Sequence, residues 1–435
     1  MSTAAEPGIL IEHLFRRQSG RMVAHFTRLL GPSGLDVAEE AVQEAMLRAL
    51  QSWPHQGTPP NPEAWLFRVA HNVAIDRVRR NQMSFGKTEE LIGELSRSAG
   101  EHPNDPGVPE QLGDDELSMI FMCCHPDIST DAQVALSLKT VGGFSVPEIA
   151  RAFLLDDATI AQRLVRAKRQ IRKQGLTLER PTGPGMERRL DAVLSVIYFL
   201  FNEGYAALAG DDLIRFDLCR EALRLGRLVA SSSLASPKVH ALVALMALQG
   251  ARLPARVNEA GDLVLLDDQD RSRWDEASLA LGFGHFDLSI AGNEISRYHI
   301  EAAIAATHAR SARGKATDWP LILQLYDQLL AFDPSPVVAL NRAVALAKVH
   351  GPAKALEAIE PLQEEPRLRE YYLLLALRGQ LLLELGREPE AATTFRSALE
   401  CRCSEPERRF LRRKLADCNQ SAPSYRALTP GASRA

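Results

Sequence analysis

The fold is decided by residues 145–173, which read SVPEIARAFLLDDATIAQRLVRAKRQIRK. Ser145 is placed as an N-cap, and Glu148 can reach back to it from the third helical position, which makes a capping box. This pattern predicts a short helix through Phe153 and a tight turn at residues 154–157. Because a second capped helix follows directly, the segment predicts a helix-turn-helix.

The second helix is capped by Asp156 or Asp157 and extends to about residue 173. At about 100° per residue its apolar side chains form one narrow stripe, Ile160, Leu164, Ala167 and Ile171. The polar side chains of the opposite stripe, with Arg163 beside them, are Thr159, Gln162, Arg166, Arg169 and Lys173. Such a face suits the DNA major groove, where Arg and Gln read base edges. A solvated amphipathic helix is the alternative, and the capped helix in front favours DNA binding.

A second basic helix is predicted at residues 62–80. Its buried stripe is Leu66, Val69, Ala70 and Val73, and another face carries Trp65, Arg68, Asn72, Asp76 and Arg79. From Trp65 to Arg80 four arginines oppose one aspartate, so the local charge is +3. An aromatic ring beside guanidiniums suits DNA that is being opened, because an unstacked base needs a π-face and its phosphates need cations. The alternative is that Trp65 belongs to the core and the arginines form a solvated helix end.

A third helix is predicted from Asp36 to Leu50, with Asp36 and Glu39 as a capping pair. The residues expected to pack are Val37, Ala41, Ala45 and Leu50, and those displayed are Glu40, Gln43, Glu44 and Arg48. A mixed-charge face of this kind is usually only solvated, but it also suits docking on another protein.

Almost every other segment shows apolar residues three and four apart, so the chain is predicted to be all-α. The exception is a short strand pair within residues 255–266, turned at residues 260–262. Residues 82–116 carry two basic and nine acidic residues, which predicts a flexible acidic linker, and residues 181–185 (PTGPG) predict a hinge.

The C-terminal block contains a weak internal repeat of 36 residues. Ala343, Ala355 and Ile359 recur as Gly379, Ala391 and Phe395, and an upstream half copy contains Ile322, Tyr326, Leu329 and Pro334. Small residues where paired helices touch and bulky ones at the next turn are typical of a tetratricopeptide-like array. Tandem helical hairpins of this kind usually bind a peptide or a protein.

Composition limits the remaining possibilities. The chain has 435 residues, a net charge of -4 and 46% hydrophobic residues, which indicates a globular protein of two or three domains. No apolar run approaches the roughly 18 residues of a membrane span, and no signal peptide is recognisable, so we expect no membrane association. Six cysteines without a disulfide pattern favour a reducing, cytoplasmic setting. Because the net charge is near neutral, binding to nucleic acid must come from local patches.

An enzyme is the first alternative, because Cys123, Cys124 and His125 are adjacent and look reactive. Zinc sites usually separate their cysteines by two or more residues, and Cys401 and Cys403 form only a thin second cluster. Zincin, P-loop and GxGxxG motifs are absent from the sequence. We therefore expect no enzyme activity, no metal and no cofactor.

The three basic or mixed-charge helices together resemble a known family. Residues 38–50 (AEEAVQEAMLRAL) and 64–80 (AWLFRVAHNVAIDRVRR) are similar to regions 2.2 and 2.4 of the extracytoplasmic-function (ECF) sigma factors of bacterial RNA polymerase. The helix-turn-helix resembles their domain 4. The remainder resembles the subgroup with a long C-terminal tetratricopeptide-like extension, and the segments that carry this likeness are Cys123–Pro126, Phe201–Tyr205, Asp267–Arg271 and Tyr298–Ala306.

The resemblance implies an order of domains. Sigma domain 2, a helical bundle, would span residues 9–81, the acidic linker 82–116 and sigma domain 4 117–173. A C-terminal helical extension would span 186–300 and the tetratricopeptide-like repeats 301–420.

The resemblance also implies partners and roles. The partners would be core RNA polymerase, through the β′ clamp helices and the β flap, and promoter DNA. The polymerase-docking residues would be Glu40, Gln43, Glu44, Leu47 and Arg48. The residues at the −10 element would be Trp65, Arg68, Asn72, Asp76, Arg77, Arg79 and Arg80. The residues at the −35 element would be Thr159, Gln162, Arg163, Arg166, Arg169 and Lys173. The loop at residues 54–62 would shape a pocket for a flipped base.

The expected function is therefore a sigma factor whose C-terminal repeats regulate or complete its activity. A helix-turn-helix repressor or activator fused to a protein-binding repeat scaffold is the second hypothesis. Such a protein has no use for the Trp65 helix or for the docking face around Gln43, so polymerase binding separates the two.

Overall fold

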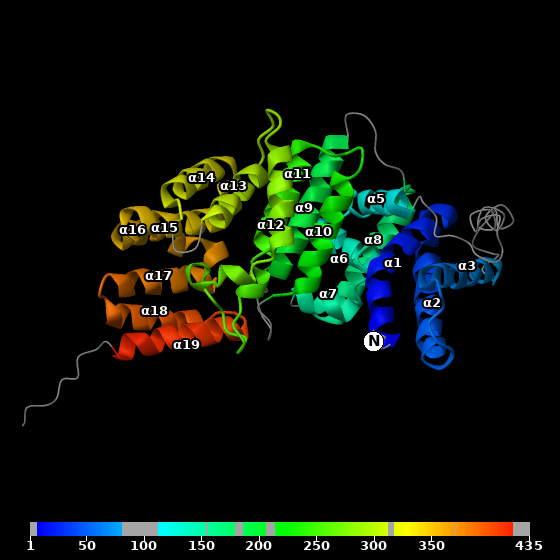
Figure 1. Cartoon of the computed structure of the whole chain (residues 1–435), viewed down its shortest axis with the longest axis horizontal. Helices are drawn as coiled ribbons and strands as arrows, with labels where there is room; N and C mark the ends of the chain where they lie inside the picture. The colour runs from blue at the N-terminus through cyan, green and yellow to red at the C-terminus, as the bar shows by residue number, and fades with distance from the viewer. Residues whose placement is uncertain are drawn as a thin grey trace, which may run out of the picture. The chain divides into compact units, whose positions relative to one another are not determined.

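The computed structural model describes residues 7–80, 112–153, 155–178, 186–205, 214–311, 317–369 and 371–420. All regular elements in these ranges are helices, as predicted (Figure 1). The chain forms two compact units: the first comprises the residues up to Leu200 together with Arg224–Ser232, and the second comprises Phe201–Leu223 and the residues from Ser233 onward. Within these ranges no helix is both long and apolar enough to span a membrane.

The first unit begins with three helices and continues with the segment that contains the helix-turn-helix. Its helices are α1 (Pro7–Leu30), α2 (Leu35–Gln56), α3 (Pro62–Arg80), α5 (Leu112–Cys123), α6 (Thr130–Thr140), α7 (Val146–Phe153), α8 (Asp157–Gln174) and the first part of α9 (Met186–Tyr205). Residues 224–230 of α10 (Phe216–Ala230) also belong to it.

Helix α1 is the centre of the first unit, because it packs against α2 and α3 on one side and against α5 and α6 on another. Phe26 of α1 stacks on Phe67 of α3, with 5.3 Å between ring centres, and both rings are fully buried. The closest approach is at Gly20, where a Cβ atom would lie 1.9 Å from the carbonyl oxygen of Val141. Only glycine therefore fits at this crossing.

The second unit is a succession of helices. After the C-terminal part of α9 and residues 216–223 of α10, it contains α11 (Pro237–Gly250), α12 (Glu276–Ser289), α13 (Arg297–Arg310), α14 (Trp319–Phe332), α15 (Pro336–His350), α16 (Pro352–Ile359), α17 (Tyr372–Glu384), α18 (Glu388–Glu400) and α19 (Glu405–Gln420). From α13 to α19 successive helices pack against one another (Figure 1).

The repeat seen in the sequence coincides with this packing. Ala343 of α15 is buried with Ala355 and Ile359 of α16 in one apolar cluster. The matching Phe395 of α18 is buried in the next cluster, and a Cβ atom on Gly379 of α17 would lie 2.8 Å from its ring. Equivalent small residues therefore occupy equivalent helix crossings.

Three predictions about connecting segments have different outcomes. The predicted strand pair at residues 255–266 is reduced to one antiparallel bridge, Val257 to Leu263, around a turn at Gly261 (φ 74°). The last five residues of the predicted linker 82–116 belong to α5 instead, because Asp115 and Glu116 form buried ion pairs. Residues 82–111 of that linker and the predicted hinge at 181–185 lie outside the described residues.

Two glycines of α12 give a matched test of how tightly the second unit packs. A Cβ atom on buried Gly282 would lie 2.7 Å from Leu248 of α11, whereas exposed Gly284 has open space around it. We expect Gly282→Ala to lower the free energy of unfolding by about 1–3 kcal/mol through overpacking. Gly284→Ala should raise it by roughly 0.5–1 kcal/mol, because alanine favours the helix. Denaturant unfolding of both variants checks this, and equal shifts would contradict it.

Candidate functional site

The helix-turn-helix forms as the sequence predicts. The Glu148 carboxylate accepts from the backbone N–H of Ser145 at 2.8 Å, and the N–H of Glu148 donates to the Ser145 hydroxyl at 3.3 Å, which confirms the capping box. Asp156 is the N-cap of α8 and accepts from the N–H of Thr159 at 2.7 Å. The buried residues of α8 are those of the predicted stripe, Ile160, Leu164, Ala167 and Ile171.

The opposite face of α8 carries the side chains predicted to read DNA. Four of them are exposed at three- and four-residue spacing, namely Gln162, Arg166, Arg169 and Lys173. The other two already have partners in the protein: the Thr159 hydroxyl donates to Asp156 at 2.8 Å, and Arg163 lies 3.4 Å from the carboxylate of Asp131. The exposed four therefore form a basic row that is open to a partner.

A third face of α8 is tied to α2, and the sequence did not indicate this contact. The Lys168 ammonium lies 2.8 Å from the Asp36 carboxylate and 2.7 Å from that of Glu39. Arg172, one turn later, lies 2.7 Å from Asp36. Burial lowers the pKa of Lys168, but the charges and hydrogen bonds of Glu39 and Asp36 outweigh burial and raise it overall.

This contact corrects the predicted capping pair of α2. Helix α2 begins at Leu35, and its N-cap Gly34 makes no side-chain hydrogen bond. Asp36 and Glu39 bind the cations of α8 instead of the free N–H groups of their own helix. Sequence spacing alone suits both uses of the two carboxylates, and only the tertiary contact decides between them.

The predicted docking face of α2 is accessible. Gln43 and Arg48 are exposed, and Leu47 keeps 53% of its surface exposed. Arg48 is paired with Glu44 at 2.9 Å, and Glu40 forms an ion pair with Arg77 of α3. Two predictions about this helix were wrong.

The first concerns Leu50, which was predicted to pack but is 47% exposed and extends the apolar surface beside Leu47. The second concerns Pro54, which was predicted to lie in a loop. Helix α2 continues through it to Gln56, so the connecting segment before α3 is shorter than expected. Pro54 lacks an N–H, and because it lies in the last turn of α2 the lost hydrogen bond is confined to the end of the helix.

Helix α3 holds the residues predicted for the −10 element. Trp65 is half-buried, and its ring meets that of fully buried Trp53 edge to face at 5.4 Å. The two interpretations of Trp65, core or surface, are thus both partly correct. Of the other side chains predicted for this element, Asn72, Asp76, Arg79 and Arg80 are exposed, and Arg68 and Arg77 are half-buried.

The helix ahead of the helix-turn-helix is joined to α1 by buried charges. Asp115 of α5 lies 2.8 Å from the His25 ring nitrogen and 2.7 Å from the Arg28 guanidinium. Neighbouring Glu116 is 1% exposed and lies 2.6 Å from Arg224. Residues that belong to the helix-turn-helix segment and to the first three helices therefore share one core.

Cys123 and Cys124 are fully buried thiols. The sulfur of Cys123 lies 3.2 Å from the Thr140 hydroxyl, and burial raises its pKa. Burial also raises the pKa of Cys124 to about 12, so neither thiol forms a reactive thiolate at neutral pH. Among the described residues no group of three or more His, Cys, Asp or Glu side chains is arranged to hold a metal ion.

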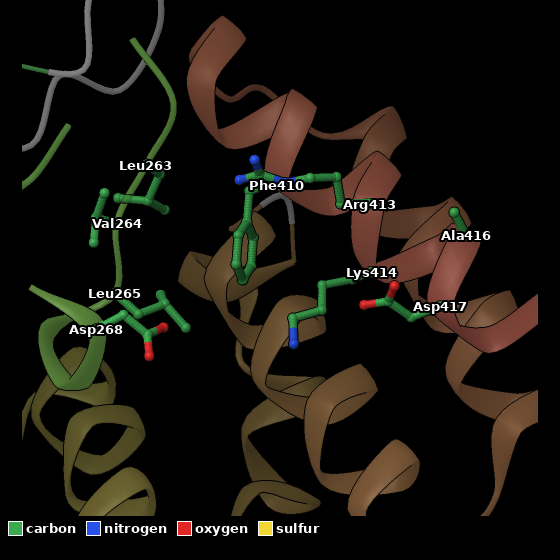
Figure 2. A pocket seen from close by; sticks show the side chains of 9 residues that line it. All are labelled: Leu263, Val264, Leu265, Asp268, Phe410, Arg413, Lys414, Ala416 and Asp417. Atoms are coloured by element: carbon green, nitrogen blue, oxygen red, sulfur yellow. The ribbon is translucent and has the colours of Figure 1, made fainter. Parts of the chain in front are cut away.

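The second unit has an open pocket of about 460 Å³ between residues 263–268 and α19 (Figure 2). Figure 2 shows the Phe410 ring and the Lys414 ammonium on one side and Leu265 and Asp268 on the other. The loop is anchored beside it by Asp262, which lies 2.6 Å from Arg409 and 2.9 Å from Arg413. The pocket was not indicated by the sequence, because its two walls are about 150 residues apart along the chain.

Two family models match different parts of the chain. The model of sigma-70 region 2 matches residues 15–83, and the model of a family of unknown function, DUF6596, matches residues 189–290. The ECF RNA polymerase sigma factor SigL of Mycobacterium tuberculosis is 28% identical over 182 residues, which is 40% of this chain and 93% of SigL. SigM of Bacillus subtilis is 27% identical over 139 residues, 31% of this chain and 78% of SigM. No solved structure matches significantly.

The N-terminal part of the chain therefore contains a sigma-70 region 2 and is similar in sequence to sigma factors of the ECF type. An uncharacterized protein of Rhizobium meliloti (strain 1021) is 42% identical over 382 residues, which is 88% of this chain and 90% of the relative. The chain belongs to the family of that protein, and the likeness extends well beyond the part shared with SigL and SigM.

Lys168→Met tests the contact between α2 and α8. The substitution leaves the Glu39 carboxylate, which is 8% exposed as a residue, without its cation. We expect it to lower the free energy of unfolding by about 3 kcal/mol, the cost of breaking a buried pair. Arg172→Ala, which removes a more exposed pair, should cost at most about 1 kcal/mol.

Denaturant unfolding at neutral pH measures both variants. Adding Glu39→Gln to Lys168→Met should recover most of the lost free energy of unfolding.

The ion pairs between α2 and α8 also have a defined pH dependence. Burial raises the pKa of Asp36, but Lys168 and Arg172 outweigh burial and hold it below its ordinary value of 3.8. The contribution of Asp36 is therefore complete above its ordinary pKa and is lost as the pH falls through the lowered one. An unchanged stability of Lys168→Met would show that the contact carries no weight.

Proposed function

We propose that this chain binds bacterial core RNA polymerase and directs promoter-specific initiation by contacting −10 and −35 elements. The observation that supports it best is the exposed row of α8, Gln162, Arg166, Arg169 and Lys173, opposite the buried stripe of the same helix. Arginine and glutamine side chains displayed at helical spacing are the groups that read base edges in a major groove.

The proposed polymerase contact is the face of α2 around Leu47. Gln43, Glu44, Leu47 and Arg48, with Glu40 beside them, would dock on the β′ clamp helices, and the domain that contains α8 would contact the β flap. Two exposed leucines three residues apart among charged side chains support a protein-docking face, because an exposed apolar patch rimmed by polar residues is typical of an interaction site.

The proposed −10 contact is α3. Trp65, held against Trp53, offers one face of its ring for a base, and Arg68, Asn72, Asp76, Arg77, Arg79 and Arg80 would serve the flanking phosphates and bases. Part of this set is paired within the protein, since Arg77 binds Glu40 and Arg79 lies 4.0 Å from Asp76. The exposed ion pairs are weak enough to yield to phosphates.

For the second unit we propose a tetratricopeptide-like array that regulates or completes the sigma activity through a peptide or protein ligand. The support is the recurrence of small residues at the crossings of α15 with α16 and of α17 with α18. In this proposal the chain acts in the cytoplasm and has no catalytic role.

Binding of the purified full chain to core RNA polymerase, in competition with the primary sigma factor, tests the proposal. Competitive binding supports it, and DNA binding without polymerase binding would favour the repressor or activator instead. The full chain is preferable to a truncation near residue 181, because residues 186–200 and 224–232 belong to the first compact unit.

Leu47→Asp is expected to weaken polymerase binding at least about tenfold, because it places a charge in an apolar contact. Leu288→Asp is the matched control, since Leu288 is also 53% exposed but lies in the second unit. Competition binding measures the polymerase affinity of both variants, and equal affinities would show that Leu47 is not part of the interface.

Arg166→Ala is expected to weaken promoter binding by roughly 1–3 kcal/mol and to relax the preference at the −35 element. Arg172→Ala should leave the preference unchanged, because Arg172 is engaged by Asp36. Binding of the polymerase complex to promoters with single substitutions in that element measures both effects. An unaltered preference in Arg166→Ala would exclude this residue from base recognition.

A further inference from the structure

Arg252, two residues after the end of α11, is a half-buried arginine with no ion-pair partner among the described residues. Among the described residues no carboxylate and no hydrogen-bond acceptor engages its guanidinium, and its Nε atom is buried without a partner. The guanidinium instead lies 5.8 Å from the centre of the Trp274 ring. Removing a cation from water is costly unless an anion compensates it, so this position indicates a place for an anion.

A second guanidinium lies on the same indole. Arg271 is 4.6 Å from the centre of the Trp274 ring and donates to the carbonyl of His308 at 2.8 Å. Burial lowers the pKa of Arg271, and the charge of Arg252 lowers it further. The nearby carboxylate of Asp267 is already bound to Lys348 at 2.8 Å. Two neighbouring cations that repel each other are stabilised when an anion lies close to both.

Unpartnered polar atoms surround the two arginines. Trp274 is 4% exposed and its Nε1 atom has no partner, and His308 is 9% exposed with its Nδ1 atom unpartnered. Burial, together with Arg252 and Arg271, lowers the pKa of His308 to about 4, so its ring is neutral at pH 7. Buried polar groups normally have hydrogen-bond partners, and several without them in one cluster indicate that a ligand supplies them.

Segments that are far apart in sequence meet at this cluster. Arg271 comes from the segment 267–271, and the groups that act electrostatically on the Tyr326 hydroxyl include Glu301, Arg252 and Tyr205. Burial, reinforced by Glu301, raises the pKa of Tyr326 to about 12, so it remains a neutral hydrogen-bonding group. Tyr205 of α9, Glu301 of α13 and Arg252 therefore lie within electrostatic range of Tyr326 on α14.

We propose that Arg252, Arg271 and Trp274 form a binding site for the carboxylate or phosphate group of a small anionic ligand. The planar fork of Arg252 suits either oxyanion, because both accept two parallel N–H donors. The indole N–H of Trp274 donates to the same group, and neutral His308 adds a hydrogen bond without adding charge. This site lies in the second compact unit and does not depend on polymerase or DNA binding.

The test uses the full chain with labelled indole nitrogens, since the protein has only four tryptophans. Inorganic phosphate and malonate are titrated separately, with chloride at equal ionic strength as the control. We expect a saturable shift of the Trp274 signal with at least one of the two oxyanions, while the Trp53 and Trp65 signals stay in place. Tighter binding of phosphate identifies a phosphoryl ligand, and tighter binding of malonate identifies a carboxylate.

Calorimetry of variants gives an independent readout. Arg252→Gln should reduce the affinity at least about tenfold, and Trp274→Phe, which keeps an aromatic ring but removes the N–H, about two- to tenfold. Arg396→Gln changes an exposed arginine of α18 and should have no effect. A shift that chloride reproduces, the absence of a saturable shift, or an affinity unchanged from that of the unaltered chain in both site variants would overturn the proposal.

Discussion

The ammonium of Lys168 joins the two helices on which the proposed activity depends. It lies within 2.8 Å of carboxylates at the start of α2, and one of these, on Glu39, is almost fully buried. A buried carboxylate requires a cation, so α8 is held with its Lys168 face against α2. Since the apolar stripe of α8 packs inside its own domain, the remaining face, which carries Arg166, is left to solvent.

The sequence predicted what depends on local spacing. The Ser145–Glu148 capping box, the Asp156 cap and the four-residue stripe of α8 follow from periodicity within one segment, and the structure confirms them. The prediction that Asp36 and Glu39 cap their own helix was wrong, because their partner Lys168 is more than a hundred residues away in the sequence. The same limit applies to Asp115, which composition assigned to a linker and which a buried contact with α1 places in α5.

The candidate site was predictable to a similar extent. Which side chains of α8 face outward follows from helical geometry, so Gln162 and Arg169 were placed correctly at the surface. That Thr159 is occupied by its own cap, and Arg163 by Asp131, depends on rotamers and on a neighbouring helix. The half-burial of Trp65 on α3 could not be predicted from its own segment, because it depends on the ring of Trp53, which lies on another helix.

The two units differ in whether their buried charged side chains are paired. In the first unit the buried acids are paired: Glu39 with Lys168, Asp115 with Arg28, and Glu116 with Arg224. Such pairs balance the charge of each acid, although Oε1 of Glu39 and Nε2 of His25 are buried without a hydrogen-bond partner. In the second unit, Arg252 has no such partner among the described residues, and the indole N–H of Trp274 beside it is equally unsatisfied. Because a fold that kept this arrangement for packing alone would bear an uncompensated desolvation cost, the balance favours a ligand as its physical reason.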